Sequence, residues 1–506
     1  MTSMSAKALA GIAAATVAVG VAQLVGAAFG PEADVRTAVG SSVIELTPGP
    51  VKEWAIQTFG TADKLFLSVM VLLTIAAVAA VAGILETRRR PLGSLLVVAA
   101  GGLGCAAVLS RAGATLVDVV PTVVGAACGV AVLRLLVSGR LSDPTSSDTD
   151  TDQGRRRSLV TLGLLGAGVA SGVAGVVISR LTSSVSGDRQ QFALPRADVT
   201  APPIPDAVQP KGVALPSFVT GNDAFYRIDT ALTVPQVSRT DWALRIHGLV
   251  DREVTFRYED LDRFEVVEKV VTLTCVSNPV GGDLISNAVW TGYRVKDLLA
   301  EAGVQADADM VLSMSVDGWT AGTPVEALTG EDAILAIGMN GEPLPIEHGY
   351  PARLVVPGLY GYVSATKWVT DLELTRFDRA QAYWTRLGWS ARGPIKTESR
   401  IDVPRSGADV AVGPVTFGGV AWAQNRGVRS VEVQIDDGEW QQASLGDSYS
   451  GDTWRLWSIP WEARDPGLHK ITVRATDNSG YTQTPDRADP VPDGATGWHS
   501  ITFAVR

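Results

Sequence analysis

Long, almost uninterrupted apolar stretches occupy the first third of the chain. A membrane-spanning helix needs about 20 consecutive apolar residues. Stretches of this kind occur at roughly 6–29, 65–85, 92–109, 116–137 and 159–178. Core helices of a soluble protein rarely follow one another in this way. The pattern therefore predicts an N-terminal multi-pass α-helical membrane region over residues 1–181.

Basic residues flank two of these stretches. "ETRRR" at 86–90 ends the second, and "GRRR" at 154–157 precedes the fifth. Lys and Arg clusters stay on the cytoplasmic side, so both clusters agree with a cytoplasmic N-terminus. Five crossings then place residues 182–506 on the extracytoplasmic side of the cell membrane.

The basic cluster before the fifth stretch has a second interpretation. Arg156, Arg157 and Ser158 look like a twin-arginine export signal, which serves proteins that fold before export. A plain basic flank explains the same residues equally well. No small-residue cleavage site clearly follows, so we expect the helix to stay as an anchor.

Two stretches of the chain lack long apolar runs. The acidic residues 138–153 are expected to form a mobile cytoplasmic loop. Residues 195–216 contain six prolines, which favour an extended chain. We therefore expect residues 182–216 to be a Pro-rich tether between the membrane region and a soluble part.

Short β-branched runs and amphipathic segments alternate after residue 217. "DWALRIHGLV", the start of "TFRYEDLDRF" and "ARLVVPG" predict strands, while "YRVKDLLAEAG" predicts a helix that ends at Gly303. This alternation favours an α+β domain over residues 217–395.

Residues 396–506 show strand patterns without helices. "VTFGGVAWA", "VRSVEVQIDDGEWQQA", "TWRLWSIPWEA", "HKITVRATDNSG" and "WHSITFAVR" are separated by turn residues, and "DDGEW" is typical of a hairpin. The pattern predicts an immunoglobulin-like β-sandwich.

Composition narrows the functional classes. The net charge of −10, without a basic patch interleaved with aromatic residues, argues against nucleic-acid binding. The first histidine is His247, which excludes a histidine-ligated haem in the membrane region. We expect those helices to anchor the protein or to dock a partner.

Cys275 is the single cysteine after residue 181. It ends a β-branched run, and Asn278, Pro279, Gly281 and Gly282 after it predict a loop. A thiol at such a junction is a buried core residue, a nucleophile or a metal ligand. A cysteine hydrolase needs a histidine that activates the thiol, and the histidines lie far away in the sequence.

Residues 217–506 resemble the sulfite oxidase family of molybdopterin-dependent oxidoreductases. The resemblance rests on motifs in the expected order, namely "FVTGNDAFYRID", "LTCVSNPVGG", "AVWTGYRVKDLL", "EHGYPARLVVPGLYGYVSATKW", "VTFGGVAWA" and "TWRLWSIPW". It implies one molybdenum held by molybdopterin in the α+β domain, no haem, and a sandwich of the dimerisation type, hence a possible homodimer.

The resemblance also implies roles for individual residues. Cys275 would bind molybdenum as a thiolate, a soft ligand, and Tyr383 in "AYW" would be the active-site tyrosine. The residues expected to hold the pterin and its phosphate are Asn222, Phe225, Tyr226, Asn278, His348, Arg353, Ser364, Thr366 and Lys367. The spacing leaves open which of 364–367 bind the phosphate.

The substrate stays open at this point. Sulfite-oxidising members carry an arginine after the cysteine, whereas this chain has Pro279 and Val280; Arg294 or Arg386 are candidates to replace that charge. The activity expected is oxygen-atom transfer, either oxidising sulfite or reducing a sulfoxide or similar oxide. It needs a small-molecule oxo donor or acceptor and a separate electron-transfer partner, a cytochrome or a quinone-linked enzyme. The alternative from another class is a cofactor-free, membrane-anchored binding module.

Overall fold

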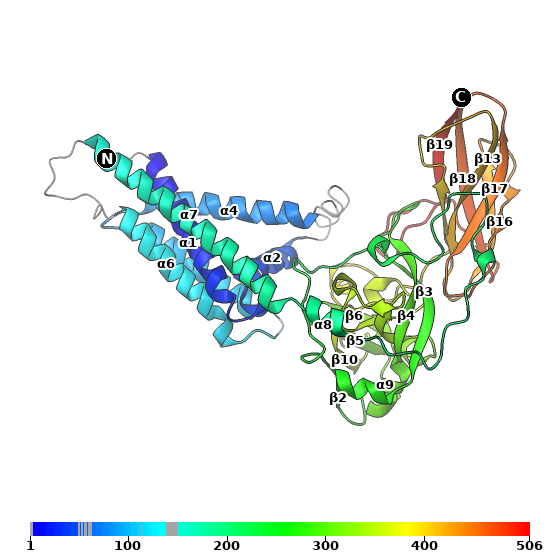
Figure 1. Ribbon diagram of the computed structural model, residues 1–506, viewed down its shortest axis with the longest axis horizontal. Coiled ribbons are helices and arrows are strands. Elements are labelled where there is room, and N and C mark those ends of the chain that lie inside the picture. Colours follow the sequence, from blue (N-terminus) through cyan, green and yellow to red (C-terminus); the bar gives the residue numbers. More distant parts are fainter. Residues whose placement is uncertain are drawn as a thin grey trace. The chain divides into compact units, whose positions relative to one another are not determined.

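The computed structural model describes residues 4–48, 51, 54, 58, 63–111, 113–137 and 150–506. The chain divides into two compact units. The first comprises Met1–Ser184 with Ala231–Gln236, and the second comprises Val185–Thr230 with Val237–Arg506. Figure 1 labels the elements of both units.

The first unit is helical. Its described helices are α1 (Met4–Gly26), α2 (Val35–Leu46), α4 (Asp63–Leu85), α5 (Leu92–Leu109), α6 (Val120–Val137) and α7 (Asp150–Ser183). Five helices of the described chain are long and apolar enough to cross a membrane. They coincide with the five apolar stretches, so the sequence prediction of five long apolar helices is confirmed.

Small residues bring these helices together. Gly11 of α1 lies against the backbone of Ala79 and Gly83 in α4, and Gly168 of α7 lies against Thr16 and Val17 of α1. A Cβ atom at either glycine would meet a backbone atom of the neighbouring helix closer than 3.0 Å. Close packing through small residues is typical of helices in lipid, where apolar burial alone gives no driving force.

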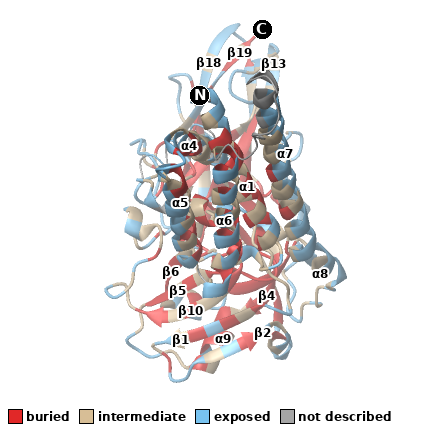
Figure 2. Cartoon of the chain, turned by 90° about the vertical axis from the view of Figure 1, so that its left-hand side faces the viewer, coloured by how far each residue is buried: buried red, intermediate tan, exposed pale blue. Residues whose placement is uncertain are grey.

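Large apolar side chains cover the outer faces of the helical unit. Leu73, Leu95, Leu103 and Leu162 are each more than half exposed, and Figure 2 shows the extent of such exposed positions on α4, α5 and α7. A soluble domain buries side chains of this kind. These faces suit contact with lipid.

The loop predicted over residues 138–153 needs a correction. Residues 138–149 lie outside the described residues, but Asp150 already begins α7, which continues to Ser183. The basic residues Arg155 and Arg156 are therefore helical and exposed. The fifth apolar helix is longer than its apolar core, because polar residues extend it at its N-terminal end.

The first part of the second unit contains two sheets. One sheet has the order β2-β1-β10-β5-β6 and the other β3-β4-β7-β8, with β9 paired to β7. The strands are β1 (Ala243–Gly248), β2 (Val254–Arg257), β3 (Val266–Thr274), β4 (Ile285–Arg294), β5 (Met310–Ser315), β6 (Thr320–Pro324), β7 (Ile334–Met339), β8 (Glu342–Pro343), β9 (Arg353–Val355) and β10 (Val369–Thr375). The strands and helix expected in this region are confirmed, with α9 (Val295–Ala302) ending at Gly303, where φ is +71°.

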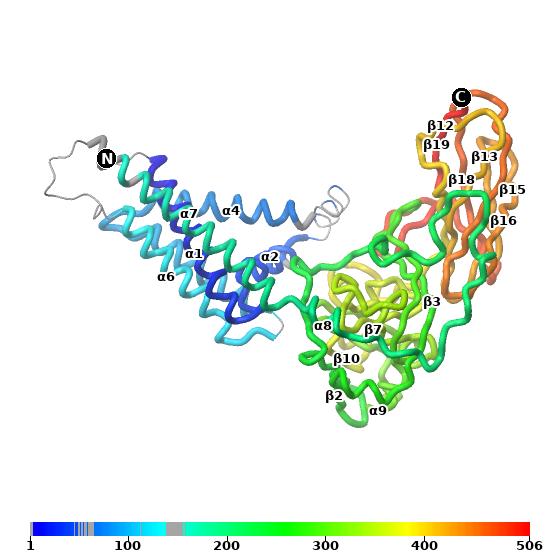
Figure 3. Tube along the Cα trace, in the orientation of Figure 1, coloured from blue at the N-terminus to red at the C-terminus, as the bar shows by residue number. Residues whose placement is uncertain are grey.

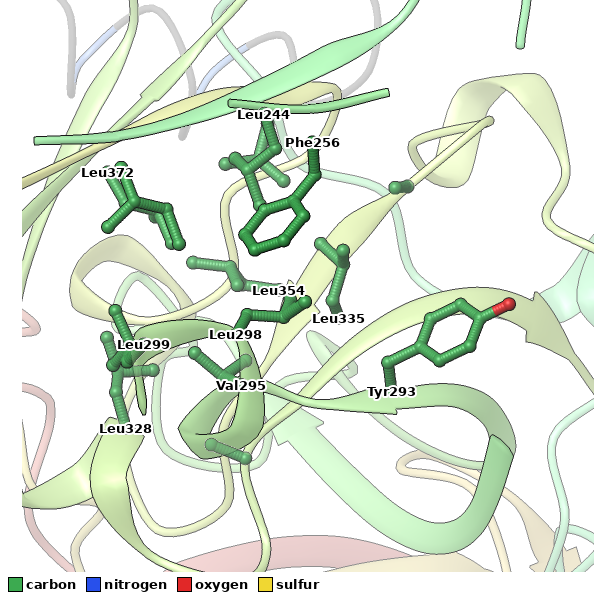
Figure 4. Packing of buried hydrophobic residues seen from close by; sticks show 14 of the residues in the cluster. Leu244, Phe256, Tyr293, Val295, Leu298, Leu299, Leu328, Leu335, Leu354 and Leu372 are labelled. Atoms are coloured by element: carbon green, nitrogen blue, oxygen red, sulfur yellow. The ribbon is translucent and has the colours of Figure 1, made fainter. Parts of the chain in front are cut away.

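The core of this part lies between the sheets and α9. Val295, Leu298 and Leu299 of α9 are buried and pack with Leu244 of β1 and Phe256 of β2, as Figure 4 shows. The apolar spacing i, i+3, i+4 on α9 places these side chains on one face. Residues of both sheets belong to this one cluster.

The strands after residue 396 form two sheets. One has the order β11-β13-β17-β16 and the other β12-β19-β18-β14-β15. Their bounds are β11 (Glu398–Val403), β12 (Asp409–Val410), β13 (Gly413–Trp422), β14 (Val428–Ile435), β15 (Gln441–Gln442), β16 (Ser444–Leu445), β17 (Arg455–Ala463), β18 (Gly467–Asp477) and β19 (His499–Val505). Phe417 and Trp457 of one sheet share a buried cluster with Val473 and Phe503 of the other. The two sheets therefore form a β-sandwich.

The segment predicted as a tether lies against the second unit. After α8 (Ser186–Gln191), Val199 pairs with Val267 of β3, and the backbone of Ala207 accepts a hydrogen bond from Asp447 in the sandwich. Val208 is buried in an apolar cluster with residues of both parts. Figure 3 shows the course of this segment from α8 past β3 toward the sandwich strands. Its extended backbone agrees with the proline content, but much of its length is bound.

Candidate functional site

Cys275 stands where β3 ends and a tight loop begins. Its N–H donates to the Leu284 carbonyl at 2.9 Å, and its own carbonyl accepts from the N–H of Asn278 at 3.1 Å. The loop returns directly into β4, because Thr274 pairs with Ile285. The predicted junction of strand and loop is confirmed. Burial raises the pKa of the Cys275 thiol, so a nearby cation is needed to hold it as a thiolate.

A group of stacked rings lies next to the cysteine. Phe225 stacks on Tyr226 with 5.4 Å between ring centroids and meets Trp290 and His348 edge-on at 5.5 and 5.4 Å. Burial, and then the charge of Cys275, raise the pKa of the Tyr226 phenol. Phe225 and Tyr226, which come from a segment before β1, are thus brought to the cysteine.

Asn222 opens a short 3₁₀ turn, Asn222–Ala224, beside β7. Its Oδ1 accepts from Asn340 Nδ2 at 2.8 Å, and its Nδ2 donates to the Met339 carbonyl at a longer 3.4 Å. Asn340 in turn binds Val289 of β4. The Asn222 side chain is therefore held at the end of the sheet that carries Cys275.

Arg353 is a buried cation at the start of β9. Its side chain is 5% exposed, and it donates to the carbonyl oxygens of His348 at 3.2 Å and Ala365 at 3.4 Å. Among the described residues it has no carboxylate partner. Burial lowers the pKa of Arg353 to about 10, so the guanidinium stays protonated at neutral pH. A buried guanidinium of this kind is suited to an anionic ligand.

The residues at 364–367 differ in what they offer. The Ser364 hydroxyl donates to the Tyr360 carbonyl at 3.0 Å, and Thr366 and Ser313 share a hydrogen bond at 2.7 Å. Both hydroxyls are fully buried and already have partners inside the protein. The Lys367 Nζ atom forms an ion pair with Asp229 at 2.7 Å. The backbone of Lys367 forms a β-bridge with that of Arg353.

His348 contributes a neutral imidazole. Burial, together with the charges of Arg353 and Lys367, lowers the pKa of His348 to about 3. The ring can therefore donate one hydrogen bond and accept another at neutral pH. Figure 2 shows how strongly burial concentrates on the strands of this unit.

Asn278 carries an unused donor. Its Oδ1 accepts from the Leu284 N–H at 2.9 Å, but its buried Nδ2 has no hydrogen-bond partner. Buried polar atoms are rarely left unpaired, so this amide fits a bound polar ligand. In the part of the chain that the structure describes, no three His, Cys, Asp or Glu residues converge on a metal site.

Tyr383 lies in the segment that follows β10. Its N–H donates to Thr320 Oγ1 at 3.0 Å, which places it beside the edge strand β6. Its ring meets Trp384 edge-on at 5.1 Å. The predicted proximity of Tyr383 to the reacting atoms stays a prediction.

Two residues of the sandwich support the cysteine loop and carried no signal in the sequence. Arg400 Nη1 donates to the Gly282 carbonyl at 2.7 Å, across 118 residues, and Arg400 Nε pairs with Asp402 at 2.8 Å. Gly281, with φ +79°, leaves no room for a side chain because the His499 ring lies against it. Each contact joins residues that lie far apart in the sequence. No local pattern of apolar and polar residues indicates such a contact.

The two arginines considered as sources of substrate charge lie differently. Arg294 pairs with Glu265 and Glu331. It ends β4, a strand of 10 residues, and so lies about 30 Å from Ile285 at about 3.3 Å per residue. Arg294 therefore does not reach the cysteine. Arg386 has an exposed side chain in the turn Thr385–Leu387.

Comparisons with known proteins agree on one family. The family described as "Oxidoreductase molybdopterin binding domain" matches residues 231–384. An uncharacterized oxidoreductase, YuiH, of Bacillus subtilis is 36% identical over 154 residues, covering 30% of this chain and 75% of that protein. Human mitochondrial sulfite oxidase is 29% identical over 354 residues, covering 59% of this chain and 64% of the human protein.

Two further known proteins are similar to this chain. The nitrate reductase [NAD(P)H] of Hordeum vulgare is 29% identical over 320 residues, covering 50% of this chain and 35% of the plant protein. Among solved structures, the sulfane dehydrogenase SoxCD of Paracoccus pantotrophus is 26% identical with a TM-score of 0.48, covering 53% of this chain and 75% of that chain. The chain thus spans just under two thirds of the length of human sulfite oxidase.

Proposed function

Because the chain belongs to the sulfite oxidase family of molybdopterin-dependent oxidoreductases, we propose that it is a membrane-anchored enzyme that transfers an oxygen atom at molybdenum on the extracytoplasmic side. The observation that carries the proposal is the convergence of a buried thiol, Cys275, with a buried guanidinium lacking a carboxylate, Arg353, around one group of rings.

The residues present fit molybdopterin. Cys275 Sγ is the protein ligand to the metal, and Asn278 Nδ2 and the Asn222 amide are donors for the pterin. His348 offers a neutral ring beside Phe225. Arg353 takes the phosphate, with Lys367 next to it, while Ser364 and Thr366 keep their internal partners. When bound, the cofactor supplies two-electron oxo-transfer chemistry.

A neutral oxide such as a sulfoxide suits the cysteine loop better than sulfite. The loop itself carries Val280 and no cation, and the guanidinium that contacts it, Arg400, is balanced by Asp402. A sulfite dianion needs net positive charge in its pocket, whereas a neutral oxide does not. Sulfite oxidation is the second candidate, since the named mammalian relatives are sulfite oxidases.

We also propose a location and partners for the protein. The five apolar helices anchor the protein, and Arg88, Arg89 and Arg90 stay on the cytoplasmic side. Arg156 and Arg157 direct export of the folded domain by the twin-arginine route. A cytochrome or quinone-linked partner exchanges electrons with the site. The sandwich is immunoglobulin-like and forms a homodimer. Tyr383 acts at the reacting atoms.

One assay tests the activity. Full-length protein, made in a host with a functional cofactor pathway and purified in detergent, is given sulfite with ferricyanide, or methionine sulfoxide with reduced viologen. We expect faster turnover with the sulfoxide, loss of turnover in Cys275→Ser, and unchanged turnover in the control Cys128→Ser. Faster turnover with sulfite would make sulfite the substrate in place of the sulfoxide. No turnover in either direction would overturn the proposed function.

A further inference from the structure

A cavity lies between the end of the α+β part and the sandwich. It measures about 570 Å³, and its walls come from residues 390–398, from Arg426 of the sandwich and from the loops at 477–484 and 493–497. Pockets for small organic ligands have volumes of about 300–1,000 Å³. The cavity is therefore large enough for a ligand of amino-acid size.

Glu398 lines this cavity, and its carboxyl group lacks a full set of hydrogen-bond partners. The side chain is 4% exposed, and its Oε1 is buried and makes no hydrogen bond. A buried carboxyl group without a partner is costly, so Glu398 is suited to a ligand that donates to it. Strand β11 begins at Glu398 and places its side chain on the same side as that of Arg400, two positions later.

Most other charges of the cavity are balanced within the protein. Lys396 Nζ pairs with Asp493 at 2.8 Å, and Arg426 Nε pairs with Asp477 at 2.9 Å. Arg392 differs, because its guanidinium lies over the Phe377 ring at 5.0 Å and has no carboxylate partner among the described residues. Its side chain is exposed, which places it at the rim. One acid at depth and one cation at the rim are thus left unpaired.

We propose that this cavity binds a small zwitterion of the amino-acid type, with its ammonium group on Glu398 and its carboxylate on Arg392. On binding, the Glu398 carboxyl group loses its proton and meets the ammonium group, while Arg392 meets the carboxylate. The ligand itself carries no net charge into the protein. The already paired side chains, Lys396 and Arg426, frame the site and need not rearrange.

The zwitterion site is separate from the molybdopterin site but shares a wall with it. Tyr360 and Tyr362 point to the cavity side, where Tyr362 Oη donates to the Ser390 carbonyl at 2.8 Å and Tyr360 Oη accepts from the Lys396 N–H at 3.4 Å. Gly361 between them lies on the other side, where a Cβ atom would be 3.8 Å from the Thr274 carbonyl. Occupancy of the cavity is therefore positioned to affect the segment that borders Cys275.

Proton release gives the proposal a distinctive readout. Burial raises the pKa of Glu398 to about 8, although Lys396 opposes the shift; Tyr360, Asp493, Asp477 and Arg426 are the other ionisable groups nearby. At pH 7 the free carboxyl group is mostly protonated, so an arriving ammonium group displaces its proton. Binding at pH 7 should release about one proton per ligand.

The test is calorimetry on the full-length protein in detergent at pH 7, in two buffers of different ionisation enthalpy. The probes are L-norleucine, pentylamine, which lacks the carboxylate, and hexanoate, which lacks the ammonium. We expect norleucine to bind with proton release, pentylamine to bind more weakly, and hexanoate not to bind. Failure of both norleucine and pentylamine to bind at millimolar concentration overturns the proposal.

Variants locate the site. Glu398→Gln should weaken norleucine binding about tenfold or more and abolish proton release. Arg392→Met, at an exposed position that should not affect folding, should weaken norleucine while leaving pentylamine unchanged. Glu439→Gln, an exposed sandwich residue outside the cavity, is the control. Norleucine binding to Glu398→Gln or to Arg392→Met as tightly as to the wild type contradicts the site, whatever the oxo-transfer activity of the protein.

Discussion

The Arg353 guanidinium lies 5.1 Å from the centroid of the Trp290 ring. The first residue comes from β9 and the second from β4, so the contact crosses the sheet that ends at Cys275. A guanidinium held by a ring and three carbonyl oxygens keeps its net charge, which makes an anion its natural partner. The phosphate of the pterin is such an anion.

Removing this cation should impair cofactor retention. Arg353→Met is expected to lower the molybdopterin content of purified protein about tenfold or more, because a charge-assisted hydrogen bond to phosphate contributes about 1.5–3 kcal/mol. The measurement is molybdenum and pterin per chain. Without cofactor, the variant should melt no lower than the wild type, because the substitution removes an unpaired buried charge.

Arg379→Met, at an exposed position, is the matched control and should retain its cofactor. Undiminished cofactor in Arg353→Met contradicts the phosphate assignment. A variant that loses cofactor and also melts far lower than the cofactor-free wild type points to a packing role for Arg353.

The pair of Arg400 and Asp402 should stabilise the fold as a unit. Arg400→Met leaves the partly buried Asp402 carboxylate without its partner, which is expected to cost up to about 3–5 kcal/mol. Adding Asp402→Leu should recover most of that loss. Thermal unfolding of both single variants and the double variant measures the coupling, and Arg405→Met at an exposed position is the control. Additive losses would show that the two side chains are not coupled.

The same variants separate stability from activity. Arg400 also holds the Gly282 carbonyl, a contact that the double variant does not restore. We therefore expect the double variant to fold at near wild-type temperature and to turn over more slowly. Wild-type turnover by the double variant would mean that the cysteine loop does not depend on Arg400.

Two histidines of the sandwich should change stability with opposite signs as the pH falls. Burial, with Arg400 and Arg487, lowers the pKa of His499 to about 4, whereas an unfolded histidine titrates near 6.5. The unfolded state then binds the extra proton first, so stability falls as the pH drops from about 6.5 to about 4. His499→Asn should reduce this loss.

His469 provides the internal comparison. Its hydrogen bond to Asp436 raises the pKa of His469, so its contribution is present below about 6.5 and is lost as the pH rises through the higher folded value. His469→Asn should therefore change melting temperature at acidic pH and leave it unchanged at pH 9. If melting temperature depended on pH in the same way in both variants, the environments described for His499 and His469 would be wrong.

Local patterns predicted the elements of the chain well. Apolar length identified the five long helices, alternation identified the strands from β1 to β19 that were expected, and Gly303 marked the end of α9. The motif around Cys275 predicted the loop. These features depend on neighbours a few residues apart, whose spacing is visible in the sequence.

Long-range packing was not predictable in this way. The prolines of residues 195–216 favour an extended course but do not say that Val208 is buried or that Ala207 binds Asp447. Arg400 and His499 reach the cysteine loop from the sandwich, and Ser364 and Thr366 turn to internal partners. Each of these contacts depends on how elements far apart in the sequence pack together. The spacing of apolar residues along one element does not encode that packing.

We propose above all that this chain holds molybdenum at Cys275. The direct measurement is the molybdenum content of full-length protein purified from a host with a functional cofactor pathway. We expect about one molybdenum per chain, accompanied by one pterin. Content below about a tenth of an equivalent, in folded protein from a host that loads a known molybdopterin enzyme fully, would contradict it.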